Sequence, residues 1–198
     1  MRLTRDPRPV ALALAGFLAA ACAHAPPPAE TPSARPAPTP VPEPLRSALS
    51  GTWVYAGGEA ERAQVDEAVE HATADMGFLA RGIAAEALRA RARPRDQYTL
   101  AIDGSAVSIS SPDFPTEQGE VGGAPVSVTD RFGDTNQTTF ELRDGALVEA
   151  GKSTDGSGET VFTPDPDGKT LRIRRLMQSD RISAPVDVTL SYRRQGIP

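Results

Sequence analysis

From residue 96 to the end of the chain, apolar and polar residues alternate in short segments. Tyr98, Leu100 and Ile102 begin this pattern, in which every second side chain is apolar. A period of two places these side chains on one face of a strand, so the pattern predicts a series of half-buried β-strands, with a further short strand near residues 116–120. The later positions of the series are Val107, Ile109, Val126, Val128, Thr138, Phe140, Leu142, Leu147, Val148, Val161, Phe162, Leu171, Ile173, Met177, Val186, Val188, Leu190 and Tyr192.

Asp-Gly pairs separate several of these segments, at residues 103–104, 144–145, 155–156 and 167–168. An Asp-Gly pair between two alternating segments is a strong signal for a β-hairpin, because both residues accept positive φ angles. We therefore expect about eight to ten antiparallel strands that run up and down and close into a barrel, which removes exposed sheet edges. The predicted fold class is mainly β with a helical insertion (α+β).

The segment Gly51–Tyr55 precedes this region and predicts the first strand, because it combines β-branched and aromatic residues. Trp53 is the one tryptophan of the chain, and a side chain of this size dominates the core that it enters. Residues 59–91 then follow a helical period. Gly77 interrupts this period, so we expect either two helices that meet near residues 76–77 or one bent helix. The apolar face of the helical region consists of Val65, Val69, Ala72, Met76, Leu79, Ile83 and Ala87.

Residues 1–21 have the features of a lipoprotein signal peptide. A basic start is followed by an apolar stretch at residues 10–20, and alanines precede Cys22. The segment Leu18-Ala19-Ala20-Ala21-Cys22 resembles the lipobox of bacterial lipoproteins, although its leucine stands one place earlier than usual. This resemblance implies that Cys22 is acylated and anchors the protein in a membrane. The alternative is an ordinary cleavage site beside an incidental cysteine.

Residues 22–45 are rich in proline and alanine and carry almost no large apolar side chain. Such a segment cannot bury enough surface to fold, so we expect a disordered, extended tether between the anchor and a domain at residues 46–198. Residue 23 is alanine rather than aspartate. By resemblance to lipoprotein sorting in Gram-negative bacteria, this implies a protein of the cell envelope, lipid-anchored on the periplasmic face of the outer membrane.

The chain carries a formal charge of −5, and loss of residues 1–21 would remove more arginines than acidic residues. An acidic protein lacks the basic surface that neutralises phosphates, so we expect no nucleic-acid partner. Cys22 is the only cysteine, and neither His24 nor His71 has a second histidine at metal-binding spacing. We therefore predict no metal, no cofactor and no catalytic residue, and a monomer. Pairs of carboxylates could still act as acid and base, and the sequence does not choose among them.

Gly51 and Trp53 form a Gly-x-Trp motif on the first strand, and Arg193 and Arg194 lie near the end of the last strand. This combination resembles the lipocalin and fatty-acid-binding (calycin) group of barrels, in which a terminal arginine packs across the tryptophan and closes one end. We assign this role to Arg194, which shares a strand face with Tyr192, because an indole face attracts a cation. The helical insertion likewise resembles the helical lid of fatty-acid-binding proteins. The alternative is a tryptophan in some other β core.

Arg175 is a charged residue on an otherwise apolar strand face, which also carries Leu171, Ile173 and Met177. If this face points into the barrel, a guanidinium lies inside and must be paired. Arg175 can then bind a ligand carboxylate or phosphate. The alternatives are pairing with an internal acid, or a β-bulge that turns the side chain outward.

Tyr98, Phe140, Arg175 and Tyr192 are the candidate ligand-binding residues. The first functional hypothesis is that a lipid-anchored, lipocalin-like envelope protein binds a small apolar or amphipathic ligand among them. The second is a structural or protein-interaction role for a barrel filled by its own side chains, since small barrels can be either. An enzyme is the third. An open cavity near these residues would favour ligand binding, and a packed interior would favour the second hypothesis.

Overall fold

The computed structural model describes residues 37–196. Each predicted Asp-Gly pair lies at a connection between consecutive strands, and Asp144 and Gly145 both have the positive φ angles that a two-residue hairpin turn requires. The helices are α1 (Glu43–Leu49), α2 (Gly58–Ala72) and α3 (Phe78–Ala92). The strands are β1 (Gly51–Tyr55), β2 (Gln97–Asp103), β3 (Ala106–Ser111), β4 (Phe114–Glu120), β5 (Val126–Thr129), β6 (Thr135–Arg143), β7 (Ala146–Lys152), β8 (Ser157–Pro164), β9 (Thr170–Gln178) and β10 (Val186–Arg194).

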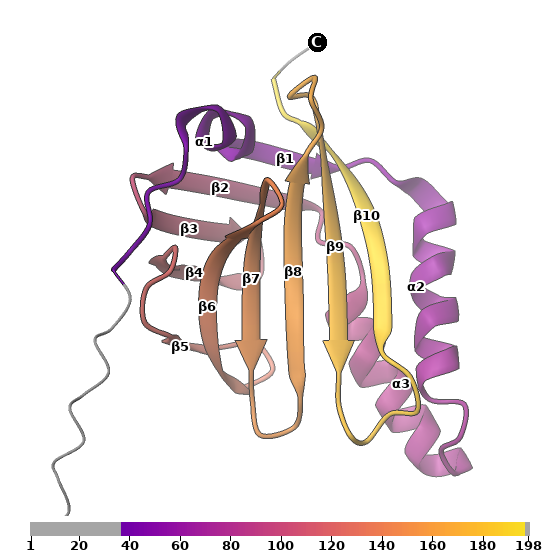
Figure 1. Ribbon diagram of the computed structural model, residues 1–198. Coiled ribbons are helices and arrows are strands. Elements are labelled where there is room, and N and C mark those ends of the chain that lie inside the picture. The colour runs from indigo at the N-terminus through magenta and orange to yellow at the C-terminus, as the bar shows by residue number, and fades with distance from the viewer. Residues whose placement is uncertain (1–36, 197–198) are drawn as a thin grey trace, which may run out of the picture. The chain divides into compact units, whose positions relative to one another are not determined.

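All ten strands belong to one antiparallel sheet, with the order β4-β3-β2-β1-β10-β9-β8-β7-β6-β5. Consecutive strands are neighbours throughout, except between β4 and β5, and β1 also pairs with β10. In Figure 1 the strands β6 to β10 form a front layer, and β2, β3 and β4 run across behind them. The sheet therefore curls into the up-and-down barrel that the sequence predicts.

The barrel is nearly closed where β4 approaches β6. Val121 follows β4 and forms a bridge with Phe140 of β6, and the Gly122 N–H donates to the Phe140 carbonyl at 2.8 Å. The Phe140 ring lies so close to Gly119 that a Cβ at this glycine would stand 2.6 Å from the ring. Gly119 thus permits the close approach of the two ends of the sheet, although β4 and β5 are not hydrogen-bonded to each other as neighbours.

Trp53 and Arg194 close the end of the barrel beside α1, as the resemblance to calycins implies. Trp53 stands directly opposite Arg194 in the β1–β10 pairing, and the guanidinium carbon lies 4.3 Å from the indole centroid. The Trp53 Nε1 donates to the Leu49 carbonyl at 2.8 Å, and Arg194 Nη1 donates to the Ser50 carbonyl. A Cβ at Gly51, where φ is 135°, would stand only 2.7 Å from Arg194 Nη1. The glycine of the motif therefore leaves room for the guanidinium.

Packing of the chain onto the barrel begins earlier than residue 46, where the sequence places the domain boundary. The Thr39 N–H donates to the Val121 carbonyl at 2.8 Å, and Val41 is buried. The prolines of this stretch are compatible with α1, because Pro44 lies in the first helical turn, where its missing N–H costs no hydrogen bond. The predicted signal peptide, Cys22 and most of the predicted tether lie outside the described residues.

The helical insertion consists of two helices, one of the two expected arrangements. α2 buries its predicted face, with Val65 and Val69 inside. It lies beside β10 (Figure 1), where the Ser191 N–H donates to the Glu61 carboxylate at 2.8 Å. The break at residues 73–77 separates α2 from α3. The buried face of α2 and this hydrogen bond hold the start of the helical insertion against the sheet.

The predicted apolar face does not continue into α3. Leu79 and Ile83 expose 79% and 75% of their surface, whereas Ala85 and Ala92 are buried. The break resets the helical phase, so the three-residue spacing from Met76 to Leu79 across Gly77 does not describe one continuous face. No helix in the described part of the chain is long and apolar enough to span a membrane.

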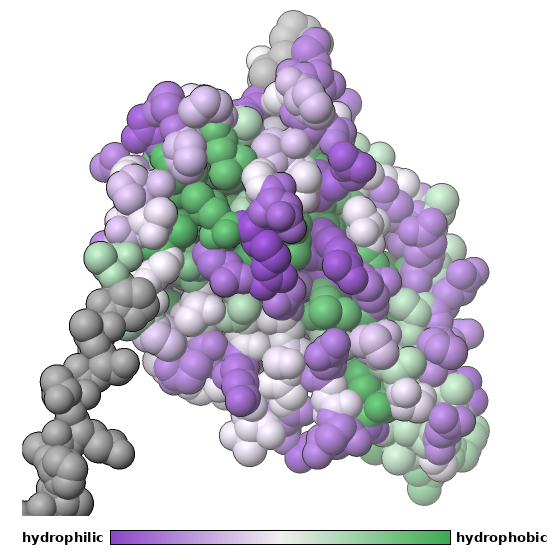
Figure 2. All heavy atoms as spheres, viewed as in Figure 1, coloured by the Kyte–Doolittle hydropathy of each residue, from purple (hydrophilic) through white to green (hydrophobic). Residues whose placement is uncertain are grey.

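The outward face of the sheet is polar. Arg172 and Arg174 of β9 pair with Asp165 at 2.7 Å and with Asp187 at 2.5 Å. Figure 2 shows hydrophilic side chains over much of the face formed by β6 to β10, with an apolar area at the upper left near α1. The strand alternation thus places these two arginines outside and Arg175 inside the barrel.

Candidate ligand-binding site

A cavity of about 430 Å³ lies inside the barrel beneath α3. Residues from α3 and from β4 to β9 line it, so both the lid and the sheet contribute to its wall. The apolar part of the wall includes Met76, Ala84, Ala87, Leu88, Val128, Met177 and Ile182. The polar part on the inner face of the sheet includes Glu117, Asn136, Thr138, Glu149, Thr160 and Arg175, and Arg95 adds to it from the connection before β2. The cavity therefore offers an apolar wall and charged groups to the same ligand.

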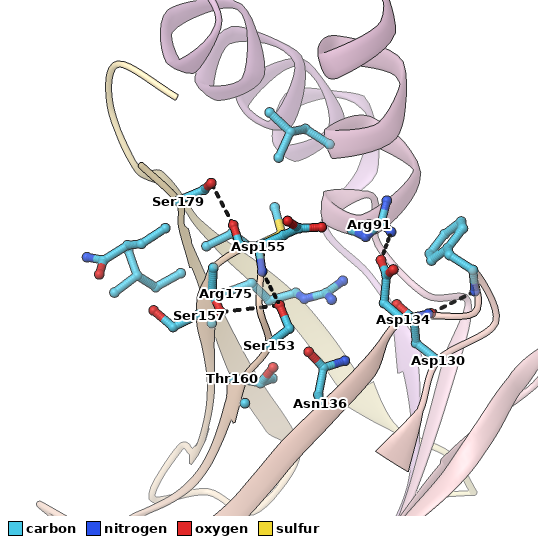
Figure 3. A pocket seen from close by; sticks show the side chains of 18 of the residues that line it. Arg91, Asp130, Asp134, Asn136, Ser153, Asp155, Ser157, Thr160, Arg175 and Ser179 are labelled. Carbon is cyan, nitrogen blue, oxygen red and sulfur yellow. Dashed lines mark hydrogen bonds and ion pairs between the residues drawn. The ribbon is translucent and has the colours of Figure 1, made fainter. Parts of the chain in front are cut away.

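Arg175 points into this cavity from β9. It pairs with Thr160 of β8 and Val188 of β10 without a register shift, so no bulge turns it outward. Its Nη1 is buried and has no hydrogen-bond partner among residues 37–196, and none of the ion pairs within this range includes Arg175. Figure 3 shows the guanidinium reaching into the middle of the cavity. A buried guanidinium without a partner carries a desolvation cost that an anion can offset.

Arg95, in the connection between α3 and β2, brings a second guanidinium to the site. Its Nη2 lies 3.7 Å from Glu117 Oε1, and the two side chains expose only 12% and 11% of their surface. The guanidinium carbon lies 4.0 Å from the ring centroid of Phe114 and 5.1 Å from that of Tyr98. Burial alone would lower the pKa of Arg95, but Tyr98, Glu117 and Glu149 raise it, so the side chain stays charged.

Glu149 of β7 is an acidic side chain that lines the same cavity as Glu117. Burial raises the pKa of Glu149 well above its usual value, and Glu117 raises it further, against the opposing effect of Arg95 and Arg175. In the sheet Glu149 stands opposite Thr160, which in turn stands opposite Arg175. Glu149 and Arg175 are thus two strands apart on one level of the barrel wall.

The other three predicted ligand-binding residues do not line this cavity. Tyr98, Phe140 and Tyr192 expose 2%, 2% and 0% of their surface. Tyr98 packs edge to face against Tyr192 with ring centroids 5.4 Å apart, and Phe140 packs onto Gly119. In a barrel this narrow, large rings that point inward meet one another and fill the space. They support the cavity instead, since the Tyr192 hydroxyl donates to the Arg95 carbonyl at 3.0 Å.

Two further ion pairs lie among the residues that line the cavity. Arg91 of α3 pairs with Asp134 at 2.5 Å (Figure 3). Asp155 pairs with Arg181 at 2.5 Å and joins the β7–β8 connection to the β9–β10 connection. The Arg91 guanidinium also lies over the Phe132 ring, 4.3 Å from its centroid. Of these contacts, the one between Arg91 and Asp134 joins α3 to the sheet. In the described part of the chain, no cluster of histidine, cysteine or acidic side chains is placed to hold a metal ion.

Comparison with known proteins identifies no family for this chain. No family model matches the chain, and no curated protein matches it. A REP1-NXSQ fatty acid transporter is 16% identical, with 76% of this chain and 98% of that chain covered at a TM-score of 0.49. Lipid binding protein 8 of Caenorhabditis elegans is 11% identical over 75% and 96% of the two chains, at 0.48. A fatty acid binding protein of Schistosoma mansoni, in complex with arachidonic acid, is 12% identical over 77% and 99%, at 0.46.

These identities and scores carry no functional assignment to this chain. The fold rests on the topology itself, namely ten antiparallel strands in a nearly closed barrel with two helices directly after the first strand. Arg194 across Trp53 adds the closed end that the sequence resemblance implies. The chain therefore has a calycin fold of the fatty-acid-binding type.

Proposed function

We propose that this chain binds a small amphipathic molecule in the cavity beneath α3, with an anionic head group at Arg175. The observation that carries this proposal is the Arg175 side chain, which lines the cavity and whose buried Nη1 has no hydrogen-bond partner among residues 37–196. Guanidinium groups form strong, directional hydrogen bonds with carboxylates and phosphates. Met76, Leu88 and Met177 offer an apolar surface to the rest of the ligand.

The cavity volume indicates a small ligand. Pockets for small molecules range over roughly 300–1,000 Å³, and the volume of about 430 Å³ falls in the lower part of this range. Part of the interior is already occupied by Tyr98, Phe162 and Tyr192, which are buried against one another. This packed part supports the alternative of a barrel filled by its own side chains. A barrel filled by its own side chains does not explain the rest of the interior, which is open and lined by charged groups. This open part favours ligand binding.

The proposal includes a lipid anchor on Cys22, which would hold the binding domain at a membrane of the bacterial envelope, facing the periplasm. Several acyl chains hold a protein on a bilayer far better than one. Membrane fractionation of cells that express Cys22→Ser tests this part independently. The variant should be soluble or remain unprocessed. Recovery of a cleaved Cys22→Ser chain with the membranes would show that the anchor lies elsewhere.

Identification of the molecules that copurify with the protein tests the binding proposal. The full chain is extracted from its host in a non-ionic detergent and purified without a tag, and organic extracts are analysed by mass spectrometry. The Arg175→Met variant is a control that removes the charge and keeps an unbranched side chain. We expect an anionic amphiphile in the wild-type extract and much less in the variant extract. Extracts that contain nothing beyond a detergent blank would contradict the proposal.

A further inference from the structure

Most of the charged side chains that line the cavity have a partner among residues 37–196. The ion pairs that include them are Arg91–Asp134, Arg95–Glu117, Arg143–Glu159 and Arg181–Asp155. Asp130 joins none of these pairs, but its Oδ1 accepts the N–H groups of Phe132 and Asp134 at 2.8 and 2.9 Å. The charged residues of the lining that then remain unmatched are Glu149 and Arg175.

Glu149 and Arg175 are opposite in sign and lie on one level of the barrel wall. Glu149 stands opposite Thr160 of β8, which stands opposite Arg175 of β9. Two strand spacings, about 9.6 Å between Cα atoms, therefore separate the two residues. No ion pair among residues 37–196 includes either of them. Each thus lacks the counter-charge that a charged group needs inside a protein.

We propose that the cavity takes a zwitterionic head group, whose acidic part binds Arg175 and whose ammonium part binds Glu149. The inference rests on the proposed function and adds a second contact to it. The ligand class is then an amphiphile that carries an ammonium group a few bonds away from a phosphate or a carboxylate. A plain fatty acid would occupy only the half of this site that Arg175 provides.

The wall between the two residues is polar and suits such a head group. Thr160 lies between them and lines the cavity (Figure 3). Its hydroxyl can donate or accept a hydrogen bond, so it can contact the atoms that join the two charged parts of the ligand. The alternative use of the same two residues is a direct ion pair between them, which the structure does not contain.

An ammonium group would supply what the carboxyl group of Glu149 lacks. Burial raises the pKa of this carboxyl, and the nearby guanidinium groups of Arg95 and Arg175 lower it by less. The protein's own cations therefore do not offset the burial of this group. A ligand cation in contact with the carboxyl favours its ionised form and makes a charge-assisted hydrogen bond with it.

Isothermal titration calorimetry of the full chain carrying Cys22→Ser tests the inference with two probes that differ in one group. Octyl phosphoethanolamine carries a phosphodiester and an ammonium group, whereas octyl ethyl phosphate carries the same phosphodiester alone. We expect the first probe to bind about tenfold to a hundredfold more tightly, the range that corresponds to a hydrogen bond between charged groups. Octanoate is the third probe and reports on Arg175 without an ammonium group.

Two variants assign the preference to one carboxyl group. Glu149→Gln keeps the size of the side chain and removes its charge, so it should bind the two phosphodiesters with equal affinity. Glu141→Gln is the matched control, because Glu141 lies exposed on β6 and does not line the cavity. This variant should keep the preference of the wild-type protein.

The outcomes separate this inference from the proposed function. Equal affinity of the wild-type protein for the two phosphodiesters would overturn the inference and leave the site at Arg175 intact, even if Glu149→Gln does not fold. A preference that survives in Glu149→Gln would overturn it too, because the ammonium would then bind elsewhere. If octyl ethyl phosphate binds Glu149→Gln more tightly than a wild-type protein without preference, Glu149 pairs directly with Arg175 and the inference fails. Failure of all three probes to bind would refute the proposed function itself.

Discussion

The contact between Trp53 and Arg194 makes a quantitative prediction about how the barrel is held closed. Trp53 is fully buried, so Trp53→Ala should lower the free energy of unfolding by about 3–5 kcal/mol. Arg194→Ala removes a cation–π contact worth about 0.5–2 kcal/mol and leaves the Ala48 and Ser50 carbonyls without their charged donor. We expect the arginine variant to lose about 2–3 kcal/mol, which is less than the tryptophan variant.

The two losses should not add, because the side chains contact each other and hold the same turn after α1. A double-mutant cycle should show a coupling of about 1–2 kcal/mol. The assay is urea unfolding followed by far-ultraviolet circular dichroism, since Trp53→Ala removes the only tryptophan fluorescence. A cycle of Trp53→Ala with Arg172→Ala, on the outer face of β9, is the matched control and should be additive. Additivity within about 0.5 kcal/mol for Trp53 and Arg194 would refute the closed-end contact.

Three further predictions concern the sheet closure, the helical phase and the buried carboxyl group of Glu149. Gly119→Val should lower the melting temperature through a loss of about 1–3 kcal/mol, because its Cβ would stand 2.6 Å from the Phe140 ring; an unchanged melting temperature would mean that the sheet ends are not in this contact. Ile83 is exposed, so Ile83→Ser should lower the free energy of unfolding in urea by less than about 0.5 kcal/mol. Val69 is buried, so Val69→Ala should lower it by about 2 kcal/mol. The reverse order would disprove the helical phase seen in the structure. Between the usual carboxyl value of 4.5 and the raised pKa of Glu149, the folded chain keeps a proton that the unfolded chain releases, so stability should fall as the pH rises. Glu149→Gln should lack this decline, and parallel pH profiles for the two proteins would show that the carboxyl titrates normally.

Local sequence patterns were sufficient to predict most of the barrel. Alternation and Asp-Gly turns are properties of adjacent residues, and the strands and hairpins follow from them. α1 was not predicted, because the proline-rich composition before residue 46 indicates a tether even though Pro44 is compatible with a first helical turn. The burial of Leu79 and Ile83 was predicted wrongly, because a break of a few residues changes the helical phase in a way that spacing alone does not show.

The site could be predicted only where a charge interrupts an apolar strand face. Arg175 follows that signal, and Glu149, which alternates with Leu147, gives the same signal and could have been found in the same way. Arg95 lies in a connection and Glu117 on an irregular strand, where no period indicates an inward direction. The aromatic candidates, such as Tyr98, do not line the cavity, because contacts between rings depend on strand register and barrel width, which the sequence pattern does not show.

The central claim is that Arg175 binds the ligand head group. The most direct test is to measure how tightly a fluorescent fatty acid binds to Arg175→Met and to Arg172→Met, each in the full chain carrying Cys22→Ser. Both variants lose a guanidinium from β9, but only Arg175 faces the cavity. Loss of a charge-assisted hydrogen-bonded pair should weaken binding about tenfold to a hundredfold in Arg175→Met and leave Arg172→Met at the wild-type value. Wild-type affinity in Arg175→Met, or an equal loss in both variants, would contradict the assignment of Arg175 as the head-group site.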